Sequence, residues 1–350
     1  MPVAASVALL AALTAALATA GLPDAKPIPP GERLDPSARQ VVQRFLGYNA
    51  LPIPTLAPRL AREQYSPGDA AREVASRQGK PTVEPVGRTS HIRIPGPGGP
   101  LLARVYTPSG RGPFPVVVYF HGGGWVVANI NVYDSSARAL TNAARSIVVS
   151  VAYRQAPENK FPAAAMDAYA SSQWVMRNAA SLGGIPSRVS VAGESAGGNL
   201  ATVAAMMARD RGGRMPTHQL LVYPVTNYAF NTQSYRTEAK DVPLDRATMR
   251  WFWGHYLRTP ADGRNPYASP LRAGSLRGMP PATIIIASED PLRSEGEAYG
   301  QRLRADGVQV QVTRYSGVMH EFFGMGAVIP KAKQAVAVAG QRLRAAQPAG

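Results

Sequence analysis

Residues 188–198 decide the fold and read Arg-Val-Ser-Val-Ala-Gly-Glu-Ser-Ala-Gly-Gly. A short strand-like run leads into Ser195 in the pattern G-x-S-x-G, and a helix-forming run of Asn, Leu, Ala and Met follows. The pattern alone also fits an ordinary turn, but a strand before it and a helix after it are typical of a nucleophile elbow. The following helix N-terminus points unpaired N–H groups at the place where an oxyanion would form. The stretch therefore predicts a serine nucleophile for acyl transfer.

Strand and helix patterns alternate on both sides of this elbow. Runs suited to strands occur at 89–94, 101–106, 116–120, 147–152, 189–192, 220–223, 283–287 and 308–315. Helix-length segments lie between or after the later runs, at 134–145, 163–180, 195–209, 293–305 and 331–345. The later strand runs are continuously apolar, as strands buried on both faces are. Residues 86–346 are therefore predicted to form an α/β core, with a mostly parallel eight-stranded sheet between helices.

Two further regions are predicted to form a helical lid. Residues 21–85 hold a Pro-rich linker followed by helix candidates at 35–48 and 58–77. An insertion at about 227–269 has no strand pattern and contains an aromatic helix at 244–257. The alternative is that this aromatic helix simply packs on the core.

Residues 1–20 are predicted to be an export signal peptide. An apolar run rich in alanine and leucine ends in Ala18-Thr19-Ala20, which fits an A-x-A cleavage site, and a Pro-rich polar stretch follows. No lysine or arginine precedes the run, so an uncleaved anchor is the alternative. Cleavage after Ala20 is favoured because alanine is barely apolar enough to hold a span in lipid. We therefore expect an exported protein, periplasmic or secreted.

The composition excludes several classes of function. The chain has 350 residues and no cysteine, which excludes disulfides, thiolate zinc sites, iron–sulfur clusters and a cysteine nucleophile. Its net charge of +16 comes from scattered arginines rather than from a basic cluster, so no nucleic-acid partner is expected. Weak association with an anionic membrane surface, which salt would abolish, stays open, as does the oligomeric state.

A serine nucleophile needs a base, and in elbow enzymes a carboxylate and then a histidine follow the serine in the chain. Three histidines follow Ser195. His218 precedes a buried strand and His255 lies on the aromatic helix, so both are interpreted as structural. His320 follows the last strand run directly, which is where a base at the end of a strand belongs.

The carboxylate is sought at the end of the preceding strand run. Ala287-Ser288-Glu289-Asp290-Pro291 follows that run and offers two acids. Asp290 is preferred because the proline after it favours an extended or turn conformation, and Glu289 is the rival.

A glycine loop follows the third strand run. Residues 121–125 read His-Gly-Gly-Gly-Trp, and no phosphate-binding pattern is present. In an elbow enzyme, an HGGG loop supplies backbone N–H groups to the oxyanion hole, beside that of the residue after the nucleophile.

Taken together, these motifs resemble the hormone-sensitive-lipase-like (bacterial family IV) carboxylesterases of the α/β-hydrolase fold. The motifs that match are HGGGW at 121–125, YRQAPE at 153–158, GESAGG at 193–198, NP at 265–266 with SPL at 269–271, DPLR at 290–293 and the loop at 317–322. The resemblance implies Ser195 as nucleophile, His320 as base, Asp290 as its orienting acid, and the N–H groups of Gly123, Gly124 and Ala196 as oxyanion hole. It also implies a helical lid, a preference for short acyl chains, and neither a metal nor a cofactor.

The sequence departs from the family pattern at three positions. Glu194 replaces the more common aspartate, Ser294 replaces an acid, and Glu321 stands where a glycine usually follows the histidine. A carboxylate at Glu321 is expected to stabilise the imidazolium of His320 and to narrow the pocket. The expected function is a serine carboxylesterase acting on small ester substrates with short-to-medium acyl groups. The alternatives are hydrolysis of an N-acyl amide, a lactone or an acetylated sugar, and a ligand-binding protein without catalysis.

Overall fold

One eight-stranded sheet forms the centre of the protein, in a computed structural model that describes residues 34–237 and 243–346. The strands are β1 (Arg88–Gly96), β2 (Gly99–Thr107), β3 (Phe114–Phe120), β4 (Ile147–Val151), β5 (Gly184–Glu194), β6 (Gln219–Val222), β7 (Ala282–Glu289) and β8 (Val310–Met319). They lie in the order β1-β2-β4-β3-β5-β6-β7-β8. β2 is antiparallel to both of its neighbours, and all the other pairs are parallel. The predicted mostly parallel α/β sheet is confirmed.

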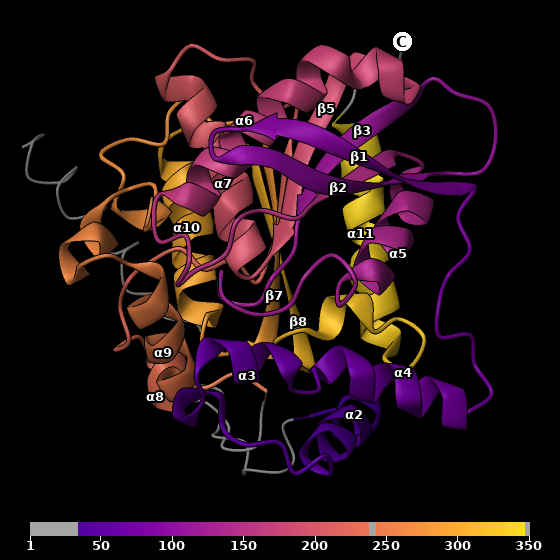
Figure 1. The fold of residues 1–350 in the computed structure, drawn as a ribbon, viewed down its shortest axis with the longest axis vertical. Helices are drawn as coiled ribbons and strands as arrows, with labels where there is room; N and C mark the ends of the chain where they lie inside the picture. The colour runs from indigo at the N-terminus through magenta and orange to yellow at the C-terminus, as the bar shows by residue number, and fades with distance from the viewer. Residues whose placement is uncertain (1–33, 238–242, 347–350) are drawn as a thin grey trace, which may run out of the picture. The chain divides into compact units, whose positions relative to one another are not determined.

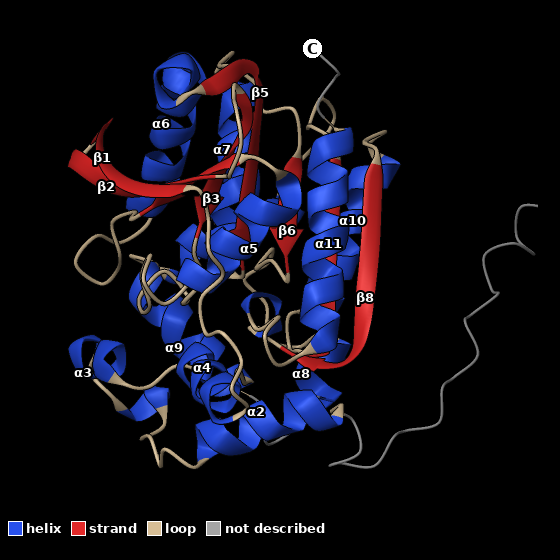
Figure 2. Ribbon diagram, turned by 90° about the vertical axis from the view of Figure 1, so that its right-hand side faces the viewer, coloured by secondary structure: helices blue, strands red, loops and turns tan. Residues whose placement is uncertain are grey.

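Helices cover both faces of this sheet, as Figures 1 and 2 show. α5 (Asp134–Ala144) and α11 (Pro330–Ala345) pack on one face, and α6 (Ala163–Asn178), α7 (Ala196–Asp210) and α10 (Arg293–Ala305) pack on the other. Successive side chains of a strand point to opposite faces. In β3, Val116 and Val118 therefore join the core on the α7 side, whereas Val117 and Tyr119 join the core on the α5 side. Burial on both sides explains the continuous apolar runs.

The remaining helices lie beyond the carboxyl ends of the parallel strands, at the lower edge of Figure 1. They are α2 (Pro36–Leu46), α3 (Pro58–Glu63), α4 (Pro67–Arg77), α8 (Gln233–Thr237) and α9 (Arg246–Tyr256). We call α2, α3, α4 and α9 the cap. Short 3-10 turns complete the chain at Ile53–Thr55, Ala179–Leu182, Pro260–Arg264, Pro270–Arg272 and Phe322–Gly324. That the cap moves as a lid stays a prediction.

The helix predicted over 58–77 is wrong as one segment, because the structure divides it into α3 and α4. Pro67 disfavours helical geometry at Ser66, which instead caps α4. Ser66 Oγ accepts a hydrogen bond from the N–H of Asp69 at 3.2 Å, and Asp69 Oδ2 accepts one from the N–H of Ser66 at 2.7 Å. This capping box ends one helix and starts the next.

Two strands extend at least four residues beyond the predicted runs. β5 begins at Gly184, where it pairs with Phe114 across a register shift, and β8 continues to Met319. Residues 317–319, predicted to be in a loop, belong to β8, and His320 is the first residue after that strand. The predicted export segment, residues 1–20, lies outside the described residues. Within residues 34–237 and 243–346, no helix has both the length and the apolar character that crossing a membrane requires.

Candidate active site

Ser195 occupies a strained turn between β5 and α7. Its φ of 55° and ψ of −119° fall outside the regions that residues with a side chain prefer, at a cost of about 1–3 kcal/mol. The Ser195 N–H donates to the carbonyl of Val222 on β6 at 2.9 Å, which fixes the turn against the sheet. A Cβ at Gly197 would overlap the carbonyl of Phe120, so only glycine lets the helix approach β3 this closely. The local sequence thus forms the expected elbow.

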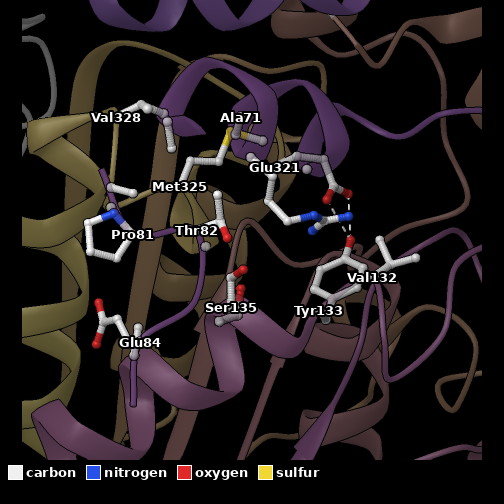
Figure 3. A pocket seen from close by; sticks show the side chains of 18 of the residues that line it. Ala71, Pro81, Thr82, Glu84, Val132, Tyr133, Ser135, Glu321, Met325 and Val328 are labelled. Carbon is white, nitrogen blue, oxygen red and sulfur yellow. Dashed lines mark hydrogen bonds between the residues drawn. The ribbon is translucent and has the colours of Figure 1, made fainter. Parts of the chain in front are cut away.

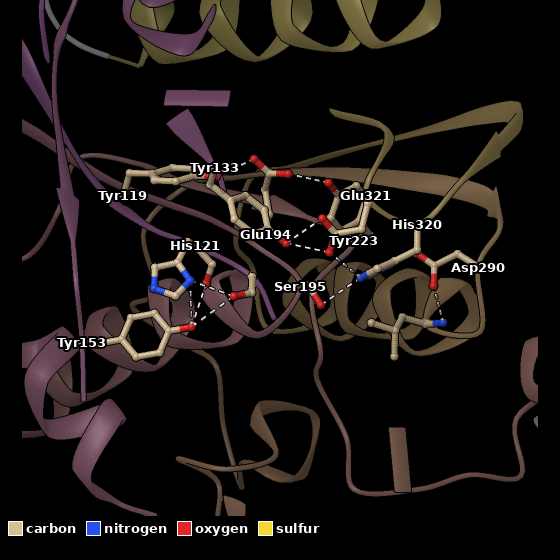
Figure 4. A network of polar contacts seen from close by, with 12 residues as sticks. Tyr119, His121, Tyr133, Tyr153, Glu194, Ser195, Tyr223, Asp290, His320 and Glu321 are labelled. Carbon is tan, nitrogen blue, oxygen red and sulfur yellow. Dashed lines mark hydrogen bonds and ion pairs between the residues drawn. The ribbon is translucent and has the colours of Figure 1, made fainter. Parts of the chain in front are cut away.

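Three side chains from three strand ends form one hydrogen-bonded chain, drawn in Figure 4. Ser195 Oγ lies 2.9 Å from Nε2 of His320, and Nδ1 of His320 lies 2.7 Å from Oδ2 of Asp290. The other oxygen of Asp290 accepts the N–H of Leu292 at 2.8 Å. All three side chains are buried. The structure therefore brings Ser195, His320 and Asp290 together and pairs Asp290, the preferred acid, with the imidazole.

The charges around His320 favour its protonated form. Burial lowers the pKa of His320, but the carboxylates of Asp290, Glu321 and Glu194 raise it, and the net direction is upward. The ring of Tyr223 packs against the imidazole, with ring centroids 4.5 Å apart. The site can therefore stabilise an imidazolium that forms when His320 takes a proton from Ser195.

The glycine loop places backbone N–H groups beside Ser195. Gly123 and Gly124 have φ values of 98° and 57°, and the carbonyl of Gly123 accepts the N–H groups of Val126 and Val127. Among the described residues, no acceptor pairs with the N–H of Gly123, Gly124 or Ala196. These three donors are therefore available to an oxyanion.

The YRQAPE motif holds this loop in place. Tyr153 donates its hydroxyl hydrogen to the carbonyl of His121 at 2.9 Å and stacks on the ring of His121 at 4.4 Å. Gln155 donates from Nε2 to the carbonyl of Val127 at 2.8 Å. Burial lowers the pKa of His121 to about 4, so this histidine is a neutral anchor at pH 7.

We expect Gly124→Ala to reduce kcat by a factor of about 10²–10³, as the loss of one oxyanion donor does. A Cβ at Gly124 would overlap the ring of Phe252 on α9, and φ there is left-handed, so the peptide must shift. Steady-state kinetics on one ester would measure the loss. Gly254→Ala is the control. Gly254 lies on α9, the helix that carries Phe252, and has open space where a Cβ would be, so the substitution should leave kcat unchanged. Equal activity of both variants would argue against Gly124 as a donor.

A layer of tyrosines and carboxylates lies behind Ser195, His320 and Asp290, and no sequence motif indicates the tyrosines. Tyr119 donates to Oε1 of Glu194 at 2.5 Å, and Tyr223 donates to the other oxygen. Burial raises the pKa of Glu194 to about 7. Tyr133 lies within 2.6 and 2.7 Å of the two carboxylate oxygens of Glu321. Tyr119 lies in β3, Tyr223 directly follows β6, and Tyr133 lies in the loop before α5, so only folding brings the three together.

The cap closes over the site and forms one wall of a pocket with an empty volume of about 810 Å³. Its floor holds Ser195, Gly123, Gly124 and His320. The cap helices, the connections between them and the segment before α9 contribute the apolar or aromatic side chains of Phe45, Ile53, Ala61, Tyr65, Pro67, Pro243, Leu244 and Phe252. The same segments contribute the polar side chains of Arg62, Gln64, Ser66, Asp69 and Thr248. Such a cavity can hold an ester whose carbonyl reaches Ser195.

The two other histidines that follow Ser195 lie outside this arrangement. Nε2 of His218 lies 2.9 Å from Oγ1 of Thr283 on β7, and His255 packs its ring against Trp251 in the cap. Within the described part of the chain, no group of three or more His, Asp or Glu side chains is placed to hold a metal ion.

Fold and site together define a hydrolase with a nucleophile elbow on an α/β sheet. The family model described as alpha/beta hydrolase fold matches residues 117–324. The chain belongs to this family, and within it to the hormone-sensitive-lipase-like esterases that its motifs resemble.

Curated relatives and solved structures agree with this assignment. The chain is 41% identical to Carboxylic ester hydrolase LipN of Mycobacterium tuberculosis over 240 residues, which cover 67% of this chain and 64% of LipN. The chain thus spans less than two thirds of LipN's length. It is 40% identical to Esterase LipI of the same organism over 262 residues, 72% of this chain and 80% of LipI. The hyperthermophilic esterase from the archaeon Pyrobaculum calidifontis superposes with a TM-score of 0.82 at 39% identity, covering 89% of this chain and 98% of that one.

Proposed function

We propose that the protein is a serine carboxylesterase that hydrolyses small esters with short-to-medium acyl groups. The hydrogen-bonded chain from Asp290 through His320 to Ser195 carries the proposal, because this order of groups turns a serine hydroxyl into a nucleophile. The relatives named as esterases support the same reaction class.

In acylation, Ser195 Oγ attacks the ester carbonyl carbon while Nε2 of His320 takes the hydroxyl proton. The negative charge that forms on the carbonyl oxygen is stabilised by the N–H groups of Gly123, Gly124 and Ala196. Asp290 holds the Nδ1 proton of His320 and stabilises the imidazolium. His320 then gives its proton to the leaving alcohol as the carbon–oxygen bond breaks.

In deacylation, water takes the place of the alcohol. His320 accepts one proton of the water as its oxygen attacks the acyl carbon, and the same N–H groups stabilise the second oxyanion. The bond from the acyl carbon to Ser195 Oγ breaks, and His320 returns its proton to that oxygen. The acid leaves, and the free serine is restored.

A p-nitrophenyl ester series from acetate to palmitate tests the proposal. Turnover is expected to peak at short-to-medium chains, because Phe252 of α9 and Leu244 of the segment before it bound the pocket in which the acyl group must fit. Release of p-nitrophenol reports kcat/KM for each chain length. An equal rate for acetate and palmitate would contradict the acyl-length proposal while leaving the esterase reaction intact.

The same assay separates the alternatives. Matched N-acyl anilides are expected to react far more slowly than esters, because an amide carbonyl is less electrophilic than an ester carbonyl and an amine is a poorer leaving group than an alcohol; lactones are assayed beside them. Turnover of an amide above that of the ester would favour an amidase. Absence of turnover on every substrate, with the protein folded, would favour a ligand-binding protein.

A further inference from the structure

Glu321 places a second carboxylate beside the imidazole of His320. Its backbone is left-handed, with a φ of 75°, which is uncommon for a residue with a long side chain. Oε1 of Glu321 lies 3.9 Å from Nε2 of His320, the nitrogen that faces Ser195. Tyr133 donates its hydroxyl hydrogen to the Glu321 carboxylate, which fixes the direction of this group. Asp290 contacts the opposite nitrogen, so the two acids have different tasks.

Glu321 also lines two cavities at once. One is the pocket that contains Ser195. The other is a second cavity with an empty volume of about 720 Å³ (Figure 3). Both cavities are lined by Val132, Tyr133 and Glu321. The second cavity carries polar side chains, among them those of Thr82, Ser135 and Ser136 and the charged side chains of Arg72 and Glu84. The Glu321 side chain keeps 21% of its surface exposed, so water reaches it. A polar cavity with several hydrogen-bonding groups suits water.

We propose that the Glu321 carboxylate, held by Tyr133 beside Nε2 of His320, positions the water that hydrolyses the acyl-enzyme and so selects water over alcohols as the acyl acceptor. This inference rests on the acyl-enzyme of the proposed function. It makes Glu321 a positioning residue for the second half of the reaction.

Water fits this position because it has two protons for two acceptors. Hydrogen bonds of about 2.8 Å can run from one water oxygen to two acceptors that lie 3.9 Å apart. His320 Nε2 takes the first proton as the water oxygen bonds to the acyl carbon, and the second proton stays on that oxygen while it points at Glu321. When the bond to Ser195 Oγ breaks, His320 returns the first proton to Oγ. The second proton leaves with the carboxylic acid.

An alcohol fits less well. An alcohol has only one hydroxyl proton, and His320 must take it. The alkyl carbon of the alcohol then lies where the second proton of water would lie, pointing toward Glu321. The carboxylate then loses a hydrogen bond and faces an apolar group, which is unfavourable for a partly buried charge. The alkyl group of a leaving alcohol meets the same penalty in reverse during acylation. A p-nitrophenyl ester is the cleaner probe of deacylation, because p-nitrophenolate is a good leaving group and makes acylation easier.

Several charged or titratable groups lie near Glu321. His320, Tyr133, Asp290 and Glu194 belong to the core, while Asp69 and Arg72 of α4 line the cavities and pair with each other at 2.6 Å. Burial raises the pKa of Glu321, whereas His320 and Tyr133 oppose that shift. The Glu321 charge in turn raises the pKa of His320. Because His320 acts as a base only when neutral, removing this charge should move the acid limb of kcat/KM to lower pH.

Partitioning of the acyl-enzyme between water and methanol tests the proposal. The enzyme is given p-nitrophenyl acetate in buffer containing methanol, and methyl acetate and acetate are quantified. Glu321→Gln is expected to raise the ratio of methyl acetate to acetate about tenfold, the effect of losing one hydrogen bond to a charged group. The ratio does not depend on how much enzyme is folded. Tyr133→Phe, which frees the carboxylate, should change it in the same direction by less.

Glu84→Gln is the matched control. It removes a carboxylate that lines only the second cavity and bonds Asn142, and it should leave the ratio and the pH profile unchanged. An unchanged ratio in Glu321→Gln would overturn the inference, even if the acid limb shifts and the wild type is an active esterase. Absence of p-nitrophenol release by the wild type would instead contradict the proposed function, so the two failures are distinguishable.

Discussion

Ser195→Ala is expected to lower kcat for ester hydrolysis by a factor of about 10⁶, close to complete loss, because the nucleophile is removed and only the oxyanion donors and the pocket remain. The variant keeps its fold, since the hydroxyl is a small group and the N–H of Ser195 still donates to Val222. Release of p-nitrophenol in the wild type and the variant measures the loss. A phosphonate ester that adds covalently to the wild type should leave the mass of the variant unchanged.

Ser190→Ala is the matched control for this substitution. Ser190 lies in β5, the strand that ends directly before Ser195, is also buried, and bonds Thr217 with its hydroxyl. Its loss can lower the free energy of unfolding but should leave kcat within about twofold, because it touches no reacting group. Residual turnover in Ser195→Ala at more than a hundredth of the wild-type rate would contradict the assignment of the nucleophile.

Asp290→Asn is expected to lower kcat by a factor of about 10⁴. The asparagine amide can donate to Nδ1 of His320, and Nε2 then carries the proton and can no longer take one from Ser195. The geometry of the chain is kept, because asparagine has the shape of aspartate and its oxygen can still accept the N–H of Leu292. Stopped-flow release of p-nitrophenol would show acylation itself slowed.

Glu289→Gln separates the two acids at the end of β7. It removes the neighbouring carboxylate, which bonds Ser288 at 3.1 Å, and leaves the pair of Asp290 and His320 in place. It should therefore keep most of the wild-type kcat. A large loss in Glu289→Gln with little loss in Asp290→Asn would reverse the roles.

The parts of the site that the sequence predicts are those formed within one short segment of the chain. Ser195 and the glycine loop could be placed because each motif joins a strand to a turn within a few residues. The choice between Glu289 and Asp290 could not follow from strand alternation, because the pairing of β7 with β8 shifts register between Ala287 and Glu289. The proline after Asp290 was the better guide to that position.

The layer behind the triad could not be predicted, for a physical reason. In its own segment, each of the three tyrosines looks like an ordinary apolar residue. The hydroxyls of Tyr119 and Tyr223 reach Glu194, and that of Tyr133 reaches Glu321, only after segments far apart in the chain have packed together. The sequence did single out the two acids as departures from a family pattern. It could not show that the left-handed backbone of Glu321 turns its carboxylate toward Nε2 of His320.

One side chain of the cap constrains how substrate range can diversify in this enzyme. Arg62 of α3 donates to the carbonyls of Val126 and Ala156 at 2.8 Å each and pairs with Glu158 at 2.7 Å. It thus joins a wall of the substrate pocket to the loop beside the oxyanion donors. Side chains such as Ile53 and Tyr65 can be exchanged to reshape the pocket without disturbing that loop. Exchange of Arg62 would alter selectivity and rate together, so new specificities are most accessible around this residue rather than at it.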